Sequence, residues 1–266
     1  MIPILKAELR KRKWSTLWWV VSIVAFLTLV LAVYPAFRDS ANQLDKSLQA
    51  IPESARNLFT DTADFLSPVG YLSSQAYYLL VPLLFSFLSI GLGSSLLARE
   101  EKDLTIELLL ARPISRTRLL LGKALAGLTI LLIVGLITAL AGMILAGIIG
   151  FKGVSPISVF NVTMMALDFS LLFGALAFVL TAVGKFGRGA AIGAATFLAF
   201  GSYIASSLDK TVKWLEPVAK VLPFHYYHPA EILRGGSFWG EFLGMLVVSV
   251  VLVVLAVFAF RRRDIG

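Results

Sequence analysis

Long apolar runs separated by short polar stretches fill the chain from one end to the other. Six of these runs are long enough to cross a bilayer as helices, which takes about 20 residues each. They cover approximately residues 17–33, 77–97, 124–149, 162–183, 190–208 and 238–260. The pattern predicts an all-α integral membrane protein: a single domain over residues 1–266, built as a six-helix transmembrane bundle.

The connection between the second and third runs has a pattern of its own, over residues 98–118. Leu104 and Leu108 share one helical face while charged residues lie away from it, which is typical of an amphipathic helix lying along the membrane interface. Pro113 ends this helix, and Ser115 is placed to cap the helix that becomes the third span. A solvated connector is the alternative interpretation of the same residues.

The segment before the last run, residues 209–238, is too apolar for a free loop and too interrupted by proline for a span. We expect short re-entrant or interfacial helices there, shielded by the rest of the protein. His225, His228 and Glu231 are spaced so that one continuous helix would bring them near a single metal ion. Pro229 argues against such a helix, so a membrane metalloenzyme is the weaker alternative and no metal site is expected.

Composition supports a membrane protein, because 58% of the residues are apolar, only 15% are charged, and the mean hydropathy is +0.85. The net charge of +8 would favour nucleic acid as a partner of a soluble protein. Here the basic residues flank apolar runs, which favours membrane lipids and excludes nucleic acid. Sixteen of the 24 Lys and Arg residues lie on one side of the predicted spans. The positive-inside rule therefore predicts a multi-pass protein of the cell membrane with both termini cytoplasmic.

One carboxylate, Asp168, lies inside a predicted span. A charged side chain at the bilayer centre costs roughly 2.5–3.5 kcal/mol, so Asp168 is expected to face a cavity, a partner helix or a protonation site. Two interpretations stay open. Asp168 makes a structural hydrogen bond, for example to Ser170 or Thr163 of a neighbouring subunit, or it serves transport, as in an ion-coupled secondary transporter.

Small residues recur at helical spacing in the fifth run, and such a pattern lets helix backbones approach closely. We expect these positions to be candidates for packing against a second copy: Gly189, Ala190, Gly193 and Ala194. The chain contains no G-x-x-x-x-G-K-[ST] motif, so it is not expected to bind ATP or to be an enzyme. It also contains no cysteine, which excludes disulfides and thiolate metal sites.

The stretch from Glu100 to Lys123 reads E-E-x-D-x-T-I-E-L-L-L-A-R-P-I-S-R-x-x-L-L-x-G-K. It resembles the permease subunits of type-2 ABC exporters, the group that includes NosY-like and NatB-like proteins. Residues 51–72 and 222–235 resemble the first outer loop of that family and its outer segment before the last span. The resemblance covers nearly the whole chain.

The resemblance implies a permease subunit of an ATP-driven exporter that pairs with a second permease subunit, expected to be identical. Two ABC ATPase subunits would supply ATP and Mg²⁺, and this chain itself would hold no cofactor. A cytoplasmic coupling helix would transmit motion from the ATPase through Glu100, Glu101, Asp103, Leu104, Glu107, Leu108, Arg112, Pro113 and Arg116. The candidates for the transport pathway or its outer gate are Asp168, Tyr203, Phe224, His225 and Tyr226.

Overall fold

The computed structural model describes residues 2–39, 67–102, 115–151, 153–184, 187–209 and 211–262. Within these ranges the chain is helical and contains no strand. Six segments are long and apolar enough to cross a membrane: Ile2–Ala36, Pro68–Leu97, Arg116–Ile149, Pro156–Val183, Arg188–Leu208 and Trp239–Arg261. The predicted class, an all-α membrane bundle of six helices, is confirmed.

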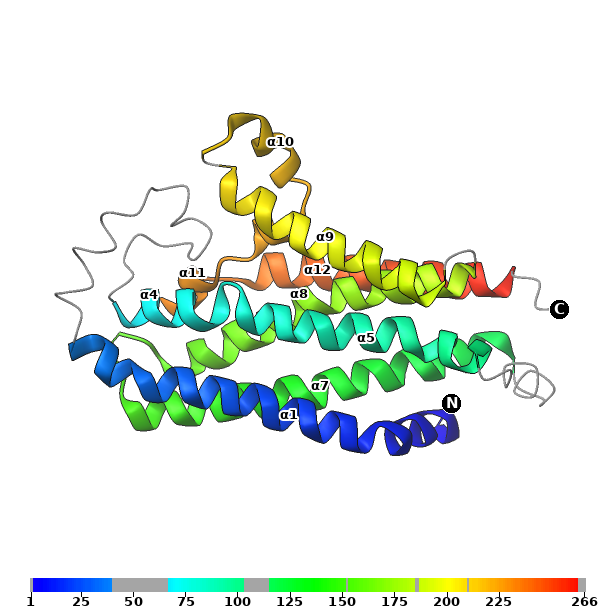
Figure 1. Cartoon of the computed structure of the whole chain (residues 1–266), viewed down its shortest axis with the longest axis horizontal. Helices are drawn as coiled ribbons and strands as arrows, with labels where there is room; N and C mark the ends of the chain where they lie inside the picture. Colours follow the sequence, from blue (N-terminus) through cyan, green and yellow to red (C-terminus); the bar gives the residue numbers. More distant parts are fainter. Residues whose placement is uncertain are drawn as a thin grey trace.

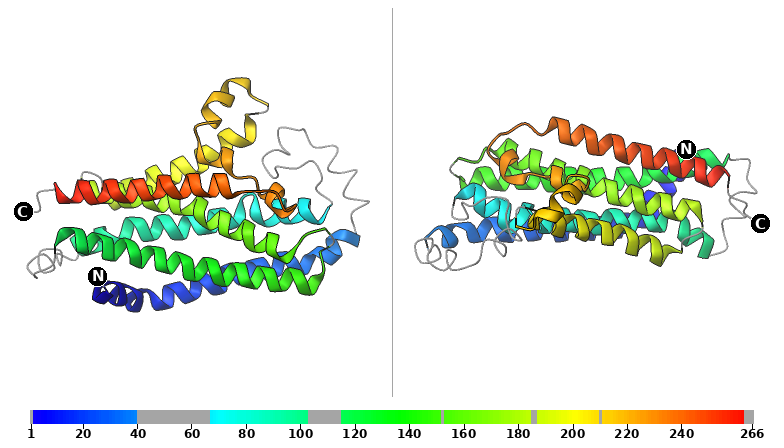
Figure 2. Two further views of the ribbon diagram at one scale, coloured as in Figure 1. Left: turned by 180° about the vertical axis from the view of Figure 1, so that it is seen from behind. Right: turned by 90° about the horizontal axis from the view of Figure 1, so that it is seen from above.

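The long helices lie side by side along the longest axis of the molecule (Figure 1). They are α1 (Ile2–Asp39), α5 (Leu80–Lys102), α7 (Arg116–Ile149), α8 (Pro156–Val183), α9 (Arg188–Leu208) and α12 (Trp239–Arg261). Both chain termini lie at one end of this bundle, which we call the termini end, and views from behind and from above agree (Figure 2). The end of α5 and the start of α7 lie there too.

Two helices extend well beyond the apolar runs that predicted them. The first helix, α1, has 38 residues and is therefore about 57 Å long, against a hydrocarbon core of about 30 Å. The start of α7 is fixed by Ser115, whose Oγ accepts a hydrogen bond from the Arg118 amide at 3.4 Å. The predicted cap is confirmed. Hydropathy locates the buried part of a helix, whereas capping locates its end.

The second span is interrupted near the end opposite the termini. It begins with α4 (Pro68–Leu72), continues through a π-helical turn, η1 (Ser73–Tyr77), and then becomes α5. The wide turn is closed by the Tyr78 amide, which donates to the Ser73 carbonyl at 2.8 Å. Pro82 lies in the first turn of α5, where its missing amide costs least. Single π-helical turns are often found at functional sites.

The centre of the bundle is α8, most of whose spanning segment is buried, in contrast to α12, whose span is mainly exposed. The closest approach in the core joins α5 and α8 at Gly93 and Gly174. A Cβ atom at Gly93 would overlap the Gly174 carbonyl, and one at Gly174 would overlap Ser89. Glycine is therefore required at both positions.

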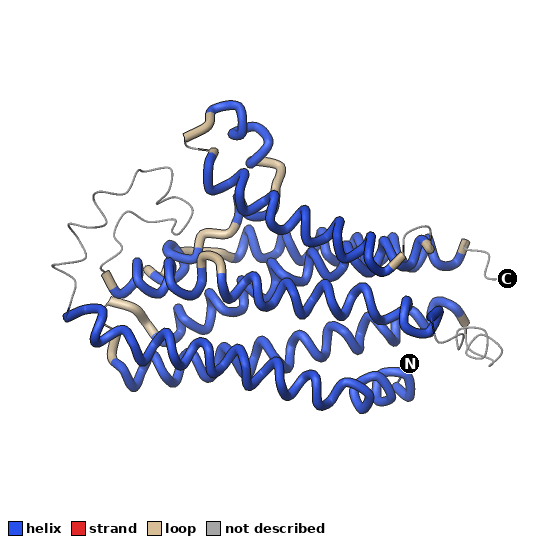
Figure 3. The backbone as a smooth tube through the Cα atoms, viewed as in Figure 1, coloured by secondary structure: helices blue, strands red, loops and turns tan. Residues whose placement is uncertain are grey.

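The 209–238 segment forms short helices, as the sequence predicted: η2 (Lys213–Leu215), α10 (Glu216–Ala219), η3 (Pro223–Tyr226) and α11 (Pro229–Leu233). They alternate with turns at the end opposite the termini (Figure 3). There α9 diverges from the other helices and carries α10 at its tip (Figure 1).

Candidate functional site

The residues predicted to couple the chain to an ATPase lie at the termini end. Glu100 and Glu101 belong to the last turns of α5, and Arg116 begins α7. The other coupling candidates lie outside the described residues: Asp103, Leu104, Glu107, Leu108, Arg112 and Pro113. The amphipathic coupling helix therefore stays a prediction. The structure shows only the two helices on either side of it, α5 and α7.

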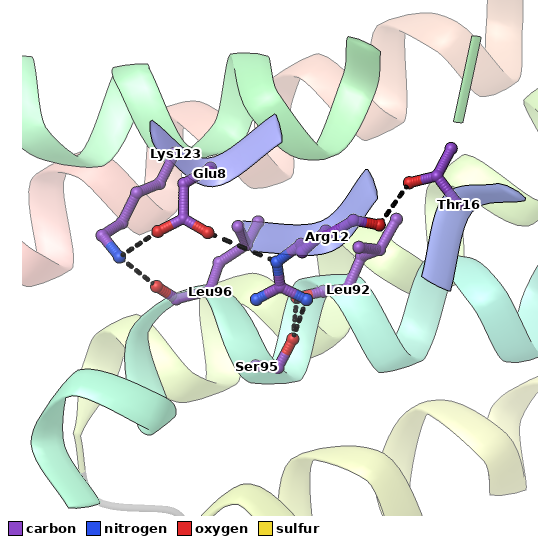
Figure 4. A network of polar contacts seen from close by, with 7 residues as sticks. All are labelled: Glu8, Arg12, Thr16, Leu92, Ser95, Leu96 and Lys123. Atoms are coloured by element: carbon purple, nitrogen blue, oxygen red, sulfur yellow. Dashed lines mark hydrogen bonds and ion pairs between the residues drawn. The ribbon is translucent and has the colours of Figure 1, made fainter. Parts of the chain in front are cut away.

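At the same end, α1 meets the two flanking helices, α5 and α7, at an ionic cluster formed by Glu8, Arg12 and Lys123 (Figure 4). Glu8 of α1 accepts from Lys123 of α7, with 3.5 Å between Oε1 and Nζ. Its other oxygen, Oε2, lies 3.3 Å from Arg12 Nε one turn further along α1. Lys123 Nζ also donates to the Leu96 carbonyl of α5 at 2.5 Å, and Arg12 Nη1 donates to Ser95 Oγ of α5 at 2.9 Å.

The ionic cluster is buried, which makes it energetically important. The side chain of Lys123 is 1% exposed, that of Glu8 7% and that of Arg12 15%. Removing one partner of a buried ion pair leaves an uncompensated charge and typically costs about 3–5 kcal/mol. Gly122, beside Lys123, lets α1 and α7 approach closely, because a Cβ there would lie 3.2 Å from Ile4. The cluster therefore joins α1, α5 and α7 close to the end of α5 and the start of α7.

The sequence alone did not indicate this cluster. Arg12 and Lys123 were expected to flank the spans as surface basic residues, whereas the structure buries Lys123 in the packing of three helices. One signal was present: Glu8 is the only carboxylate in the basic stretch from Lys6 to Lys13, and it stands four positions before Arg12. That spacing indicates a pair within one helix, but it gives no information about Lys123, which lies 115 residues away.

At the opposite end, a cluster of rings surrounds Phe224 of the 209–238 segment. We call Tyr78, Phe169, Tyr203, Phe224 and Tyr227 the aromatic cluster. The ring centroid of Phe224 lies 5.3 Å from those of Tyr78 and Tyr203, 5.7 Å from that of Phe169 and 5.8 Å from that of Tyr227. Three of these four contacts are T-shaped with interplanar angles near 80°, a favourable arrangement for aromatic pairs.

Hydrogen bonds fix the polar atoms around the aromatic cluster. The Phe224 amide donates to Ser202 Oγ of α9 at 2.7 Å, and the Tyr227 hydroxyl donates to the Tyr77 carbonyl of the π-helical turn at 2.7 Å. The hydroxyls of Tyr77 and Thr163 are hydrogen-bonded at 2.9 Å. The 209–238 segment is thus attached to α8, to α9 and to the wide turn of the second span.

Four of the five pathway or gate candidates belong to this end, and they fall into two groups. Tyr203 and Phe224 are in contact inside the aromatic cluster, beside a small cavity of about 20 Å³ that also touches Pro82, enough space for about one water. His225 and Tyr226 face outward, with His225 Nδ1 3.8 Å from Asp209 Oδ2 and the Tyr226 hydroxyl donating to the Lys220 carbonyl at 2.8 Å.

The metal arrangement considered for His225, His228 and Glu231 finds no support in this geometry. The rings of the two histidines are separated by 6.5 Å between centroids. His228 precedes α11 and Glu231 lies inside it, so the three residues do not share one continuous helix. Within the described ranges, no group of three His, Cys, Asp or Glu side chains is arranged to hold a metal ion.

Asp168, the remaining pathway candidate, lies in the middle of α8 and is 4% exposed. Neither of its carboxylate oxygens has a hydrogen-bond partner within the described part of the chain. Thr163 and Ser170 bond elsewhere, to Tyr77 and to backbone carbonyls of α8. Phe169, the next residue, belongs to the aromatic cluster, so Asp168 lies on the helix that supports the ring of Phe224.

The four small residues predicted to pack against a second copy, Gly189, Ala190, Gly193 and Ala194, are all exposed on α9. A Cβ atom at Gly189 or Gly193 would meet no heavy atom within 4 Å. Phe197, 80% exposed, continues the same face toward the opposite end. Within the described residues of this chain, the face is uncovered.

Among curated proteins no significant match was found. The family model described as ABC-2 family transporter protein matches residues 2–265, nearly the whole chain. That match spans all six long helices, the ionic cluster and the aromatic cluster. The chain belongs to the ABC-2 family of transporter proteins.

Proposed function

We propose that the chain is the membrane permease subunit of an ATP-driven exporter, working as a dimer of identical subunits with two separate ATPase subunits. The observation that carries this proposal is the family match over residues 2–265. The sequence lacks a nucleotide-binding loop, so ATP and Mg²⁺ would bind to the partner ATPases. In the cell membrane the termini end would face the cytoplasm, as the distribution of Lys and Arg predicts.

The geometry of the termini end supports docking of an ATPase between α5 and α7. There α5 ends and α7 begins. Glu101 in the last turn of α5 and Asp103, which follows that helix in the sequence, belong to the charged side of the predicted amphipathic helix. Movement of that helix would be passed on to rigid elements, because the ionic cluster holds the adjoining turns of α5 and α7 against α1. A flexible attachment would absorb the same movement.

The exposed small-residue face of α9 supports pairing with a second copy. Small residues on one helix face, as from Gly189 to Ala194, allow two helices to approach closely in lipid. The same helix carries Tyr203, a member of the aromatic cluster. A dimer formed through α9 would therefore place the two aromatic clusters on either side of a shared path. In this arrangement the 209–238 segments would form the outer gate.

The test reconstitutes the chain with its ATPase and changes the predicted docking charges. The chain alone should hydrolyse no ATP, and the complex should hydrolyse it. Charge reversal in the double variant Glu101→Lys/Asp103→Lys should remove the ATPase on co-purification, because truncating or opposing interfacial charge pairs costs about 2–5 kcal/mol. The matched control is Glu216→Lys, which reverses a carboxylate at the opposite end.

Two results would contradict the proposal. Normal ATPase binding and transport by the double variant would leave residues 98–118 as a connector only. ATP hydrolysis by the purified chain without a partner would contradict the assignment of ATP binding to another subunit. Thermal unfolding of the double variant in detergent should match that of the unsubstituted chain, which shows that its fold is intact.

A further inference from the structure

An open groove lies between α8, α12 and the 209–238 segment. Its volume is about 470 Å³, within the range of about 300–1,000 Å³ typical of small-molecule sites. Its walls are mainly apolar: Leu172 comes from α8, Val221 and Pro223 come from the 209–238 segment, and Val248 comes from α12. Val221 is 82% exposed and Val248 47%, so the groove opens sideways on the outer face of the bundle.

Two glycines of α12 make the groove deep enough to hold a chain. Gly240 and Gly244 both line it, and a Cβ built at either would meet no heavy atom within 4 Å. Space along α12 is thus left free over the two turns from Gly240 to Val248, a length of about 12 Å. A groove of this shape suits an extended hydrocarbon chain lying parallel to the helix.

A second, smaller cavity adjoins the groove, because Tyr226 and Glu241 line both. Its free volume of about 10 Å³ is close to that of a single water-sized group. Glu231, His228 and Ser237 complete its polar lining. The carboxylates of Glu231 and Glu241 make no hydrogen bond or ion pair within the part of the chain that the structure describes, and neither Lys nor Arg is among the described residues lining the two cavities.

The two cavities are ordered along α12 in the way that a lipid is ordered across a leaflet. Trp239, 61% exposed, begins α12, and tryptophan is enriched at the membrane–water interface. Glu241 therefore lies at the level of lipid headgroups. Gly244 and Val248 follow at increasing depth, at the level of acyl chains. The polar lining of the smaller cavity therefore lies nearer the membrane surface than the apolar walls of the groove.

We propose that this groove binds one phospholipid with a primary-ammonium headgroup, such as phosphatidylethanolamine, in the leaflet that meets this end of the bundle. The acyl chain lies along Gly244 and Val248, and the ammonium group donates hydrogen bonds to Glu231 and Glu241. A choline headgroup has no N–H donor and exceeds the smaller cavity. The headgroup of phosphatidylglycerol is anionic and contains no cationic group that could pair with the two carboxylates. The bound lipid contacts Tyr226 and Pro223 and so holds the 209–238 segment against α12.

The experiment measures lipid retention by native mass spectrometry of the full-length chain purified in mild detergent. Dioleoyl-phosphatidylethanolamine, -phosphatidylcholine and -phosphatidylglycerol are added in turn at equal concentrations. The ethanolamine lipid should be retained about tenfold more tightly than the choline lipid, the difference that one charge-assisted hydrogen bond typically produces. The double variant Glu231→Gln/Glu241→Gln should abolish this preference, whereas the control Glu216→Gln should preserve it.

A second variant tests the groove rather than the headgroup site. Gly244→Leu fills the channel and should lower retention of all three lipids, whereas Val250→Phe adds bulk on the face of α12 turned away from the groove and should change nothing. Equal retention of the ethanolamine and choline lipids by the unsubstituted chain would overturn the proposal. So would an unchanged preference in the double variant, or unchanged retention of the three lipids in Gly244→Leu. Circular dichroism and size-exclusion profiles establish that each variant is folded.

Discussion

At the termini end, three helices meet at the charges of Glu8, Arg12 and Lys123, whereas at the opposite end four elements meet at the rings around Phe224. The ionic cluster consists of few interactions, each of which depends on a buried charge finding its partner. The aromatic cluster consists of many smaller contacts that add up. The difference predicts that the termini end behaves as one rigid unit, while the opposite end loses stability gradually as contacts are removed.

This contrast suits the division of work in the proposed transporter. An end that receives movement from an ATPase transmits it best when its helices cannot slide separately. An end that forms a gate has to rearrange, and apolar ring contacts are exchanged at lower cost than buried ion pairs. The π-helical turn at Ser73–Tyr77 lies at the second kind of end, next to the hydroxyl of Tyr227.

The largest effect is expected for Lys123→Met, which leaves the buried carboxylate of Glu8 without its interhelical partner. The free energy of unfolding should fall by about 3–5 kcal/mol, measured by denaturant titration in detergent micelles. The double variant Glu8→Leu/Lys123→Met removes both charges of the pair and should recover more than half of that loss. If the double variant is no more stable than Lys123→Met, the loss comes from packing and not from an unpaired charge.

A somewhat smaller effect is expected for Phe224→Ala at the opposite end. Removing a buried phenylalanine side chain typically costs about 3 kcal/mol or more, and the four ring contacts are lost together. The same titration measures it, and Phe224→Leu, which keeps most of the volume, should lose about half as much. An equal loss in both variants would show that ring geometry, rather than volume, holds this end. A loss larger than that of Lys123→Met would reverse the comparison of the two ends.

Tyr77→Phe should have a modest effect, because it removes one hydroxyl and leaves the ring in place. The lost hydrogen bond to Thr163 is worth about 1 kcal/mol. Hydrogen exchange of the Ser73–Tyr77 turn should become faster in this variant, while exchange at the termini end should stay unchanged. Faster exchange at both ends would mean that the two clusters are coupled through α8.

The smallest effect is expected at Glu216, on the exposed helix α10. Its hydrogen bond and charge interaction with Lys220, 2.8 Å away, lower the pKa of Glu216 below its ordinary value of 4.5. A lowered carboxyl pKa stabilises the folded form above pH 4.5, and this contribution is lost as the pH falls through the lowered pKa. Glu216→Gln should therefore speed hydrogen exchange in α10 slightly at pH 7 and leave the thermal midpoint unchanged, since exposed pairs contribute little. A clear fall in the thermal midpoint would show that α10 is part of the stable core.

The apolar pattern by itself determined the class of the protein, its six spans and the common end of its termini. It did so because lipid leaves backbone groups no partner except in a helix, so length and hydropathy suffice to place the spans. Local chemistry added the cap at Ser115. The apolar content of residues 209–238 and their interruption by proline also indicated short helices there, and three of these helices have a proline in their first turn.

Only the tertiary structure decided which polar residues meet. Glu8 and Lys123 are 115 positions apart, and the Tyr227 hydroxyl reaches a carbonyl 150 positions away. A hydropathy pattern contains no information about such partners, because it records how often a residue faces lipid or protein and not which helix it faces. For the same reason the sequence gathered Tyr203, Phe224, His225 and Tyr226 as one set of gate candidates, whereas packing separates two rings inside the aromatic cluster from two side chains that face outward.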